Sequence, residues 1–434
     1  MNKGFERQLG HSKLKAVAQF KQLERKLEKY RQLCEKYNHF MNEYIAMNHM
    51  KPAVETNSLE CYLPHHGVLK FESNSTKLQA VFNASEKKST GFSLKDLMEC
   101  GSKLQRDILE LLLSWRAYKY VYKANCEKMY LMIKVQEDVQ QLHKIMWRNE
   151  QGAMQDFQSC TVTYGMKAAP YLALRTMQQS ASDDADVYPI ATEILKKRLY
   201  VDDLIYGSNK IEKAKQAQRK LIDILRESGF NLRKRSSNEP RLLKDLSNDQ
   251  INVSTVNFNN CSSSSTKALG LRWHLSCDIF TFDNKIENTQ KPDTKRSILS
   301  NISKLFDALC WLSPSTIKAK LLFQRLWSEH KEWDQSLSPD IQHEWSKLKE
   351  ELMNISKIKI PRWVSNTQSS VHGYADASEK AYATEVYIKT YKEDKEPRIN
   401  LIAAKTKLAP QKKRITFKNI LKKIDRLHTN INVF

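Results

Sequence analysis

The sequence predicts an α+β protein, and three neighbouring segments in the middle of the chain carry that prediction. Residues 160–179 (CTVTYGMKAAPYLALRTMQQ) begin as a strand, break at Gly165 and continue as a helix with Pro170 at an N-terminal position. Residues 199–208 (LYVDDLIYGS) place two aspartates between two short β-forming runs, which indicates a tight hairpin. Residues 211–228 have the apolar period of an amphipathic helix. This order of elements is typical of an α+β sheet with helices on one face.

The N-terminal part of the chain predicts helices followed by a second hairpin. Residues 12–47 repeat apolar side chains at three- and four-residue steps, which predicts one long amphipathic helix or two. Residues 61–83 hold two short β-type runs on either side of a polar break, and the hairpin that they predict carries Lys77. Residues 91–116 have a mixed pattern that becomes helical from about Leu104.

The remaining segments continue the mixture of strands and helices. Residues 118–135 are expected to begin as a strand, which leads into a turn and more apolar sequence. A helical pattern returns at Lys295, and two Ser-Pro pairs, at 313–314 and 338–339, each combine an N-cap residue with a first-turn proline. The predicted buried face of the helix that starts near Lys295 consists of Ile298, Ile302, Leu305 and Leu309.

Composition limits the kind of partner and compartment. The 434 residues suffice for two or three domains, and lysine and arginine outnumber the acids by 71 to 49, which gives a net charge of +22. A positive field spread along the chain favours a polyanion such as a phosphate backbone as partner. The eight cysteines show neither zinc-site spacing nor a disulfide framework, so we expect a reducing compartment. No apolar run approaches a membrane span, and the N-terminus is polar and basic, so we expect an intracellular protein that is not secreted.

Two polar pairs are candidate metal sites. Asp202 and Asp203 lie at or near the tip of the 199–208 hairpin, and adjacent carboxylates there could hold Mg²⁺, because hard cations prefer carboxylate oxygens. The alternative is an ordinary solvated turn, which is the commoner fate of an Asp-Asp pair. His65 and His66 have no third ligand at a helpful spacing, so we expect a structural role for them.

Several motifs together resemble one family. YVDD at 200–203, VTYG at 162–165 followed by AAP, and FNLRK at 230–234 resemble the reverse transcriptases of retrotransposons. The phrases CYLPHH, EKMY, GFNLRKRSSN, KALGLRWH and CWLSPSTIKAK resemble the BEL/Pao class of long-terminal-repeat elements. The resemblance runs from about residue 9 to about residue 410, with the motifs in matching order, so the chain is similar to a piece of a BEL/Pao polyprotein.

This resemblance implies a right-hand polymerase fold of fingers, palm and thumb, followed by an incomplete ribonuclease H-like segment. The implied divisions are N-terminal helices and fingers at 1–116, a palm at 117–290, a helical thumb and connection at 291–360, ribonuclease H-like strands at 366–410, and an unrecognised basic tail at 411–434.

The implied activity is RNA-directed DNA synthesis, in which two Mg²⁺ or Mn²⁺ ions are held by three carboxylates. Asp202 and Asp203 match two of them, but Asn125 stands at the position of the third, where a neutral amide cannot bridge two dications. Gln79 replaces an arginine that grips the triphosphate, and Asn83 replaces a further aspartate. Two interpretations therefore stay open: a degenerate reverse transcriptase with doubtful activity, or a catalytically dead nucleic-acid-binding remnant. A basic helical scaffold explains the ordered motifs less well.

The resemblance also assigns a substrate cleft for an RNA template, a DNA primer and deoxynucleotides. Tyr130 matches the aromatic residue that lies under the sugar and discriminates against a 2′-hydroxyl, although a tyrosine in the core is the alternative. Lys234 is either a cation near the triphosphate or a surface lysine. Residues 269–272 resemble the hairpin that grips the primer. The other implied substrate-binding residues are Tyr164, Gly165, Pro170, Lys77 and Gln79.

The C-terminal resemblance concerns ribonuclease H. Asp376, in VHGYADASEKAYATEVYIK, matches the first metal-binding aspartate of that domain, but the glutamate and the later carboxylates of the pattern have no counterpart. One ligand cannot support metal-dependent hydrolysis, so we predict no ribonuclease H activity. An intracellular site in the cytoplasm or in virus-like particles is implied, and nothing in the sequence predicts the oligomeric state.

Overall fold

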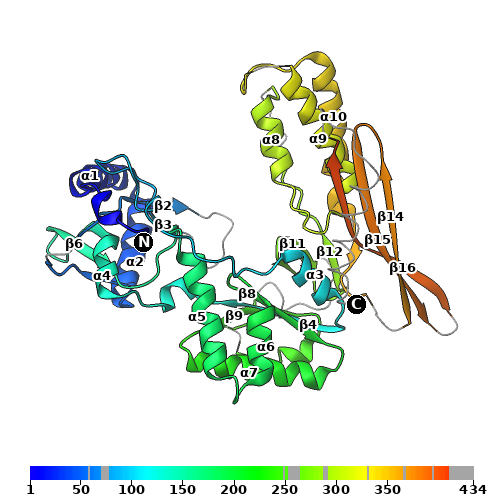
Figure 1. The fold of residues 1–434 in the computed structure, drawn as a ribbon, viewed down its shortest axis with the longest axis horizontal. Helices are drawn as coiled ribbons and strands as arrows, with labels where there is room; N and C mark the ends of the chain where they lie inside the picture. Colours follow the sequence, from blue (N-terminus) through cyan, green and yellow to red (C-terminus); the bar gives the residue numbers. More distant parts are fainter. Residues whose placement is uncertain are drawn as a thin grey trace. The chain divides into compact units, whose positions relative to one another are not determined.

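The structure is a computed structural model that describes residues 1–56, 59–69, 78–247, 250–252, 264–286, 292–329, 332–364, 368–392 and 395–409. The chain forms two compact units that alternate along the sequence. The first comprises residues 1–105, 126–196 and 223–231, and the second comprises residues 106–125, 197–222 and 232–434. Each unit is described by itself below (Figure 1).

Two amphipathic helices open the first unit. α1 (Lys13–Lys29) and α2 (Arg31–Ala46) are separated at Tyr30, whose φ of −123° and ψ of 82° interrupt the helical backbone. The prediction of one long helix or two is therefore settled in favour of two. Both helices contact the hairpin of β2 (His65–Leu69) and β3 (Leu78–Phe82), and this hairpin confirms the second predicted hairpin. Their buried faces consist of Ala16, Phe20, Leu23, Leu27, Tyr37, Met41 and Tyr44.

A three-stranded sheet continues this unit. β6 (Met154–Ser159) pairs with β1 (Met50–Pro52) on one side and with β5 (Lys144–Arg148) on the other. The prediction that a strand begins at residue 160 is wrong, because the segment that bonds to both neighbours lies just before it. The helix predicted after Gly165 is confirmed as α5 (Ala169–Asp183).

The second unit contains the hairpin predicted at 199–208. β7 (Leu199–Tyr200) and β8 (Asp203–Ser208) are antiparallel, and β8 also pairs with β4 (Tyr120–Cys126), which confirms a strand in that segment. β9 (Leu232–Ser237) completes the sheet in the order β7-β8-β4-β9. The helix predicted to end before Gly229 is confirmed as α7 (Ile211–Glu227).

A second sheet in this unit forms around the predicted primer-grip-like hairpin. β10 (Ser265–Ala268) and β11 (Leu271–His274) are antiparallel, and β12 (Ile279–Thr281) and β13 (Ile360–Pro361) extend the sheet. α3 (Ile108–Arg116) begins four residues after the predicted start, because the Asp107 side chain accepts a hydrogen bond from the backbone N–H of Leu109 and caps the helix there. The rings of Trp115 and Trp273 meet edge to face, with centroids 4.7 Å apart.

Three further helices follow, and the prediction for the first needs correction. α8 (Lys295–Ser303) ends at Ser303, so Leu305 and Leu309 lie beyond it and do not share a helical face with Ile298. Both leucines still pack against the core of the unit. α9 (Ser313–Ser328) and α10 (Pro339–Met353) both have their proline in the first turn, as predicted. Ser338 is the N-cap of α10, whereas Ser313 is already the first residue of α9.

The last three strands form a long antiparallel sheet. β14 (Ser369–Ala377), β15 (Ala381–Lys392) and β16 (Lys395–Leu408) run side by side, and α9 packs against β16 (Figure 1). Ile388, Ile402 and Ala403 join the hydrophobic core of the unit, whereas nearly all of β14 is exposed.

The shorter elements and the cysteines complete the description. The remaining elements are η1 (Phe5–Arg7), η2 (Met129–Met132), α4 (Glu137–Gln140), η3 (Gln141–His143), α6 (Pro189–Lys197), η4 (Pro240–Leu242) and η6 (Ile355–Lys357). Cys277 is disulfide-bonded, which the scattered cysteine spacing did not predict. Within the described ranges, no helix combines the length and the apolar character that a membrane crossing needs.

Candidate active site

The two aspartates of the hairpin lie where β7 turns into β8. The turn is tight because Val201 adopts a left-handed backbone with φ of 54°, a conformation that costs energy for a β-branched residue. Asp202 follows in the turn and Asp203 is the first residue of β8. Both side chains are half-buried, so this is not a freely solvated loop.

Asn125 lies directly opposite this turn. The register of β4 and β8 pairs Asn125 with Asp203. The side-chain amide nitrogen of Asn125 donates to Oδ2 of Asp202 at 2.9 Å and to Oδ1 of Asp203 at 3.4 Å. The three positions that the sequence nominated therefore converge, and Asn125 meets the carboxylates with its N–H groups.

Lys123 reaches one of these carboxylates, that of Asp203, from the same strand as Asn125. Its ammonium lies 3.2 Å from Oδ1 of Asp203 and donates to the carbonyl of Lys267, on β10, at 2.6 Å. Burial raises the pKa of Asp203, and the neighbouring ammonium of Lys123 opposes that rise. Asp203 is therefore a desolvated carboxylate whose main charge partner is a side chain of the protein.

This donor set does not fit a pair of divalent ions. Two metals need carboxylates that reach both of them, and only Asp202 and Asp203 are available here. Asn125 is neutral and presents donors instead of oxygens to the carboxylates, and Lys123 brings a positive charge to the place where a cation would bind. Elsewhere in the described ranges, no three histidine, cysteine, aspartate or glutamate side chains come together as metal ligands.

Two protein families match the chain in separate segments. The family described as "Reverse transcriptase (RNA-dependent DNA polymerase)" matches residues 68–238. The family described as "Pao retrotransposon-like RNaseH-like domain" matches residues 294–420. The chain is therefore similar to reverse transcriptases in one segment and to Pao retrotransposons in the other. No curated protein matches it in sequence.

A solved structure supports the fold of this chain. The chain is similar to the foamy viral protease-reverse transcriptase dRH, solved in complex with ds DNA, with a TM-score of 0.60 and 13% sequence identity. The match covers 92% of this chain but only 60% of the foamy viral chain. The predicted α+β right-hand polymerase fold is thereby confirmed.

The two tyrosines that the resemblance assigned to a substrate cleft lie together in the first unit. The rings of Tyr130 and Tyr164 meet edge to face with centroids 5.1 Å apart, and both are half-buried. Gly165 is exposed and has φ of 90°, a backbone that disfavours any side chain. Pro170 is exposed in the first turn of α5. The role of these four residues in binding substrate stays a prediction.

The remaining nominated residues are placed individually. Gln79 lies on β3 opposite Val68 and is half-buried, whereas Lys77 lies outside the described residues. Lys234 is exposed on β9 with φ of 52°. Asp376 is exposed on β14, where it pairs with Ala383. The positions of these residues do not test ribonuclease H activity, so its absence stays a prediction.

Lys123 is the site residue that sequence reasoning missed. Side chains alternate between the two faces of a strand, so residues two apart point the same way. Lys123 and Asn125 stand in that relation on β4, and both are half-buried on the face that meets the aspartates. Strand periodicity applied to Asn125 could have found it.

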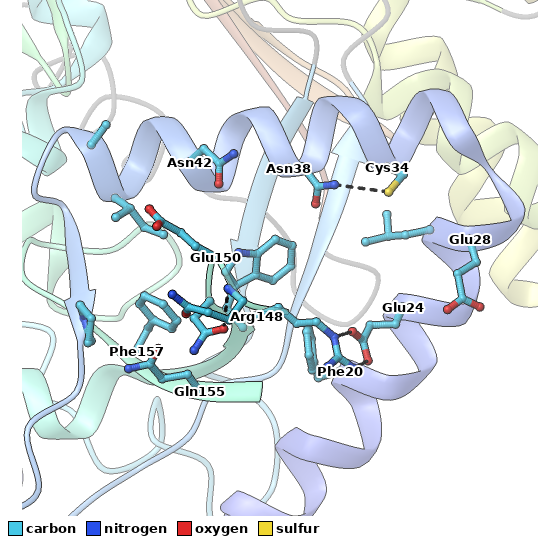
Figure 2. Close-up of a pocket in the computed structure, with 17 residues that line it drawn as sticks. Phe20, Glu24, Glu28, Cys34, Asn38, Asn42, Arg148, Glu150, Gln155 and Phe157 are labelled. Carbon is cyan, nitrogen blue, oxygen red and sulfur yellow. Dashed lines mark hydrogen bonds and ion pairs between the residues drawn. The ribbon is translucent and has the colours of Figure 1, made fainter. Parts of the chain in front are cut away.

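The first unit also contains a pocket of about 1060 Å³ that none of the nominated residues lines. Its lining includes the apolar side chains of Phe20 and Phe157, and Figure 2 shows Glu24 and Arg148 joined by an ion pair. Nε of Arg148 lies 2.5 Å from Oε1 of Glu24, so this arginine is already paired. Glu28 and Glu150 add two more carboxylates. Carboxylates in the lining repel phosphate groups, so we assign no nucleic-acid role to this pocket.

Proposed function

We propose that this chain is a Pao-type reverse transcriptase that binds an RNA template and a DNA primer but has lost efficient DNA synthesis. One observation carries the proposal: the Asn125 amide donates to both hairpin aspartates. Of the two interpretations that the sequence left open, it favours the catalytically silent one.

The chemical argument concerns charge and donor geometry. A carboxylate at position 125 would add a negative charge and two acceptor oxygens, whereas the amide adds no charge and aims its donors at Asp202 and Asp203. The two remaining carboxylates cannot offset the repulsion between two dications. Gln79 adds a further loss, because a neutral amide cannot hold phosphates as an arginine does.

Binding of nucleic acid is supported independently of catalysis. The chain carries a net charge of +22, which favours a phosphate backbone. The hairpin of β10 and β11 contains residues 269–272, which resemble the hairpin that grips the primer. We propose that four residues contribute to a deoxynucleotide site: Tyr130, Tyr164, Gly165 and Pro170.

We also propose that the protein works inside the cell, in the cytoplasm or in virus-like particles.

Primer extension on an RNA template tests the loss of synthesis. The natural protein, Asn125→Asp, and Asn125→Asp combined with Gln79→Arg are compared with Mg²⁺ and with Mn²⁺. We expect no extension by the natural protein and measurable extension by one or both variants. Asp203→Asn in the Asn125→Asp background is the matched control and must abolish any activity gained. Robust extension by the natural protein would refute the proposal.

Binding is measured separately by fluorescence anisotropy with a labelled RNA–DNA duplex. Because phosphate contacts release counterions, the logarithm of the affinity should fall linearly with the logarithm of the salt concentration. Asn125→Asp should leave this slope unchanged, since position 125 contributes no cationic contact. Absent or salt-independent binding would contradict the nucleic-acid part of the proposal.

A further inference from the structure

Lys123 has two partners that lie on different sheets. Its ammonium pairs with Oδ1 of Asp203 at 3.2 Å and donates to the Lys267 carbonyl at 2.6 Å. The side chain of Lys123 is 13% exposed and that of Asp203 is 22% exposed, so solvent screens this pair only in part. Lys123 thereby joins the YVDD hairpin to the edge of the primer-grip-like hairpin.

The local charges explain why a cation is needed here. Asp202 and Asp203 are consecutive residues in a tight turn, and two half-buried carboxylates repel one another. The N–H groups of Asn125 supply partial positive charge, and the Lys123 ammonium supplies the one full positive charge that the described structure brings to Asp203. The turn also carries the strained backbone of Val201. Neutralisation of these carboxylates therefore helps the turn to keep its shape.

We propose that Lys123 is an internal counter-cation that holds the YVDD hairpin in its folded geometry without a divalent ion. In this role Lys123 is a positioning residue. Asn125 assists it by donating to the carboxylate of Asp202. The inference rests on the proposed function, because it explains how a palm with an impaired metal site keeps a surface for the template and primer.

The geometry has a consequence for metal binding. Oδ1 of Asp203 already accepts from the ammonium of Lys123 and lies within 3.4 Å of the Asn125 amide nitrogen. A divalent ion that used this oxygen would have to displace the ammonium. The folded hairpin of the natural protein should therefore be indifferent to Mg²⁺ and to chelators, whereas loss of the Lys123 charge should make it depend on a divalent ion.

Hydrogen exchange of the full chain tests this directly. Amide exchange of residues 203–208 is measured in EDTA and in Mg²⁺ or Mn²⁺ at constant ionic strength, for the natural protein, Lys123→Met and Lys123→Arg. In EDTA we expect exchange in Lys123→Met to be about tenfold faster, the change that follows from losing roughly 1.4 kcal/mol of local stability. Divalent ions should restore the slow rate, and Lys123→Arg should behave as the natural protein.

Two further variants make the result specific. Lys318→Met removes an exposed lysine that pairs with Glu351 in the same unit and should change nothing at 203–208. If Lys123→Met does not fold, Lys123→Gln takes its place, because its polar side chain is a hydrogen-bond donor without a charge.

Two outcomes would overturn the inference. Exchange in Lys123→Met equal to that of the natural protein would show that the ammonium does not hold the hairpin. Faster exchange that divalent ions fail to slow would show a packing role without charge compensation. Neither readout depends on catalysis, so the inference can fail while primer extension still supports the proposed function, and the reverse also holds.

Discussion

The guanidinium of Arg362 forms a two-pronged ion pair with Asp278 in the interior of the second unit. Nε lies 2.6 Å from Oδ1 and the second prong spans 2.7 Å to Oδ2, while the arginine side chain is fully buried. The same guanidinium donates to the backbone carbonyls of Trp115, Tyr118 and Lys119. One side chain thus ties the segment after β13 to the turn before β12 and to the end of α3.

Removing this arginine should destabilise the second unit strongly. Arg362→Met leaves Asp278 without its ion partner and removes the donor from three carbonyls, so we expect a loss of about 3 kcal/mol of unfolding free energy. Urea unfolding followed by tryptophan fluorescence measures it.

The matched control has the same pair chemistry on the surface. Arg296 makes a two-pronged pair with Asp334 at 2.8 and 2.9 Å, and the side chains of this pair are 64% and 69% exposed. Arg296→Met should cost far less unfolding free energy than Arg362→Met, because solvent screens an exposed pair. Equal losses in the two variants would contradict the assigned importance of burial.

Acidification should destabilise the first unit through a buried histidine. Nε2 of His65 donates to the Met146 carbonyl at 2.9 Å, which leaves Nδ1 to accept from the Tyr37 hydroxyl at 2.6 Å. Burial lowers the pKa of His65 to about 4, and burial likewise lowers the pKa of His143 to about 4. In the unfolded chain a histidine has a pKa near ~6.5, so the unfolded state binds more protons below that pH.

Stability should therefore be complete above about pH 6.5 and fall as the pH falls toward 4, by at most about 1.4 kcal/mol per pH unit for each of the two histidines. Urea midpoints at pH 7, 6 and 5 measure this dependence. His65→Gln should reduce the slope, whereas His66→Gln, at the exposed neighbouring position, should change it much less, because burial and not His66 is the main cause of the lowered His65 pKa. An unchanged slope in His65→Gln would show that His65 is not a source of the pH dependence.

Gly207 permits the close pairing of β8 with β4. A Cβ at this position would lie 2.6 Å from the Tyr120 carbonyl oxygen, a backbone atom that cannot move without disturbing the sheet. Gly207→Ala should therefore cost about 3 kcal/mol, at the upper end of the range for overpacked sites. Gly152→Ala is the control: its φ is 75° but its surroundings are open, so only the left-handed strain of about 1 kcal/mol applies. Thermal unfolding of both variants gives the comparison, and a similar shift in both would refute the assigned steric role.

Local patterns in the sequence predicted most of the elements. The hairpin around Asp202 and Asp203 follows from β-forming runs on both sides of a polar pair, and α5 and α7 follow from proline and apolar period. Two errors arose where long-range pairing or helix termination outweighed local pattern. The strand β6 lies at Met154–Ser159, where it pairs with β1 and β5 on its two sides, and α8 ends before Leu305 although the apolar spacing continues.

The sequence by itself determined the family motifs, the α+β class and the replacement of a third carboxylate by Asn125, because each of these depends on residue identity and short-range order. Only the tertiary structure decided what that amide does. The register of β4 and β8 joins residues 78 positions apart and directs the Asn125 N–H groups and the Lys123 ammonium at the aspartates. Such a register is set by the packing of a whole sheet, so strand alternation could place Lys123 on the same face as Asn125 but could not show that its ammonium lies beside Asp203.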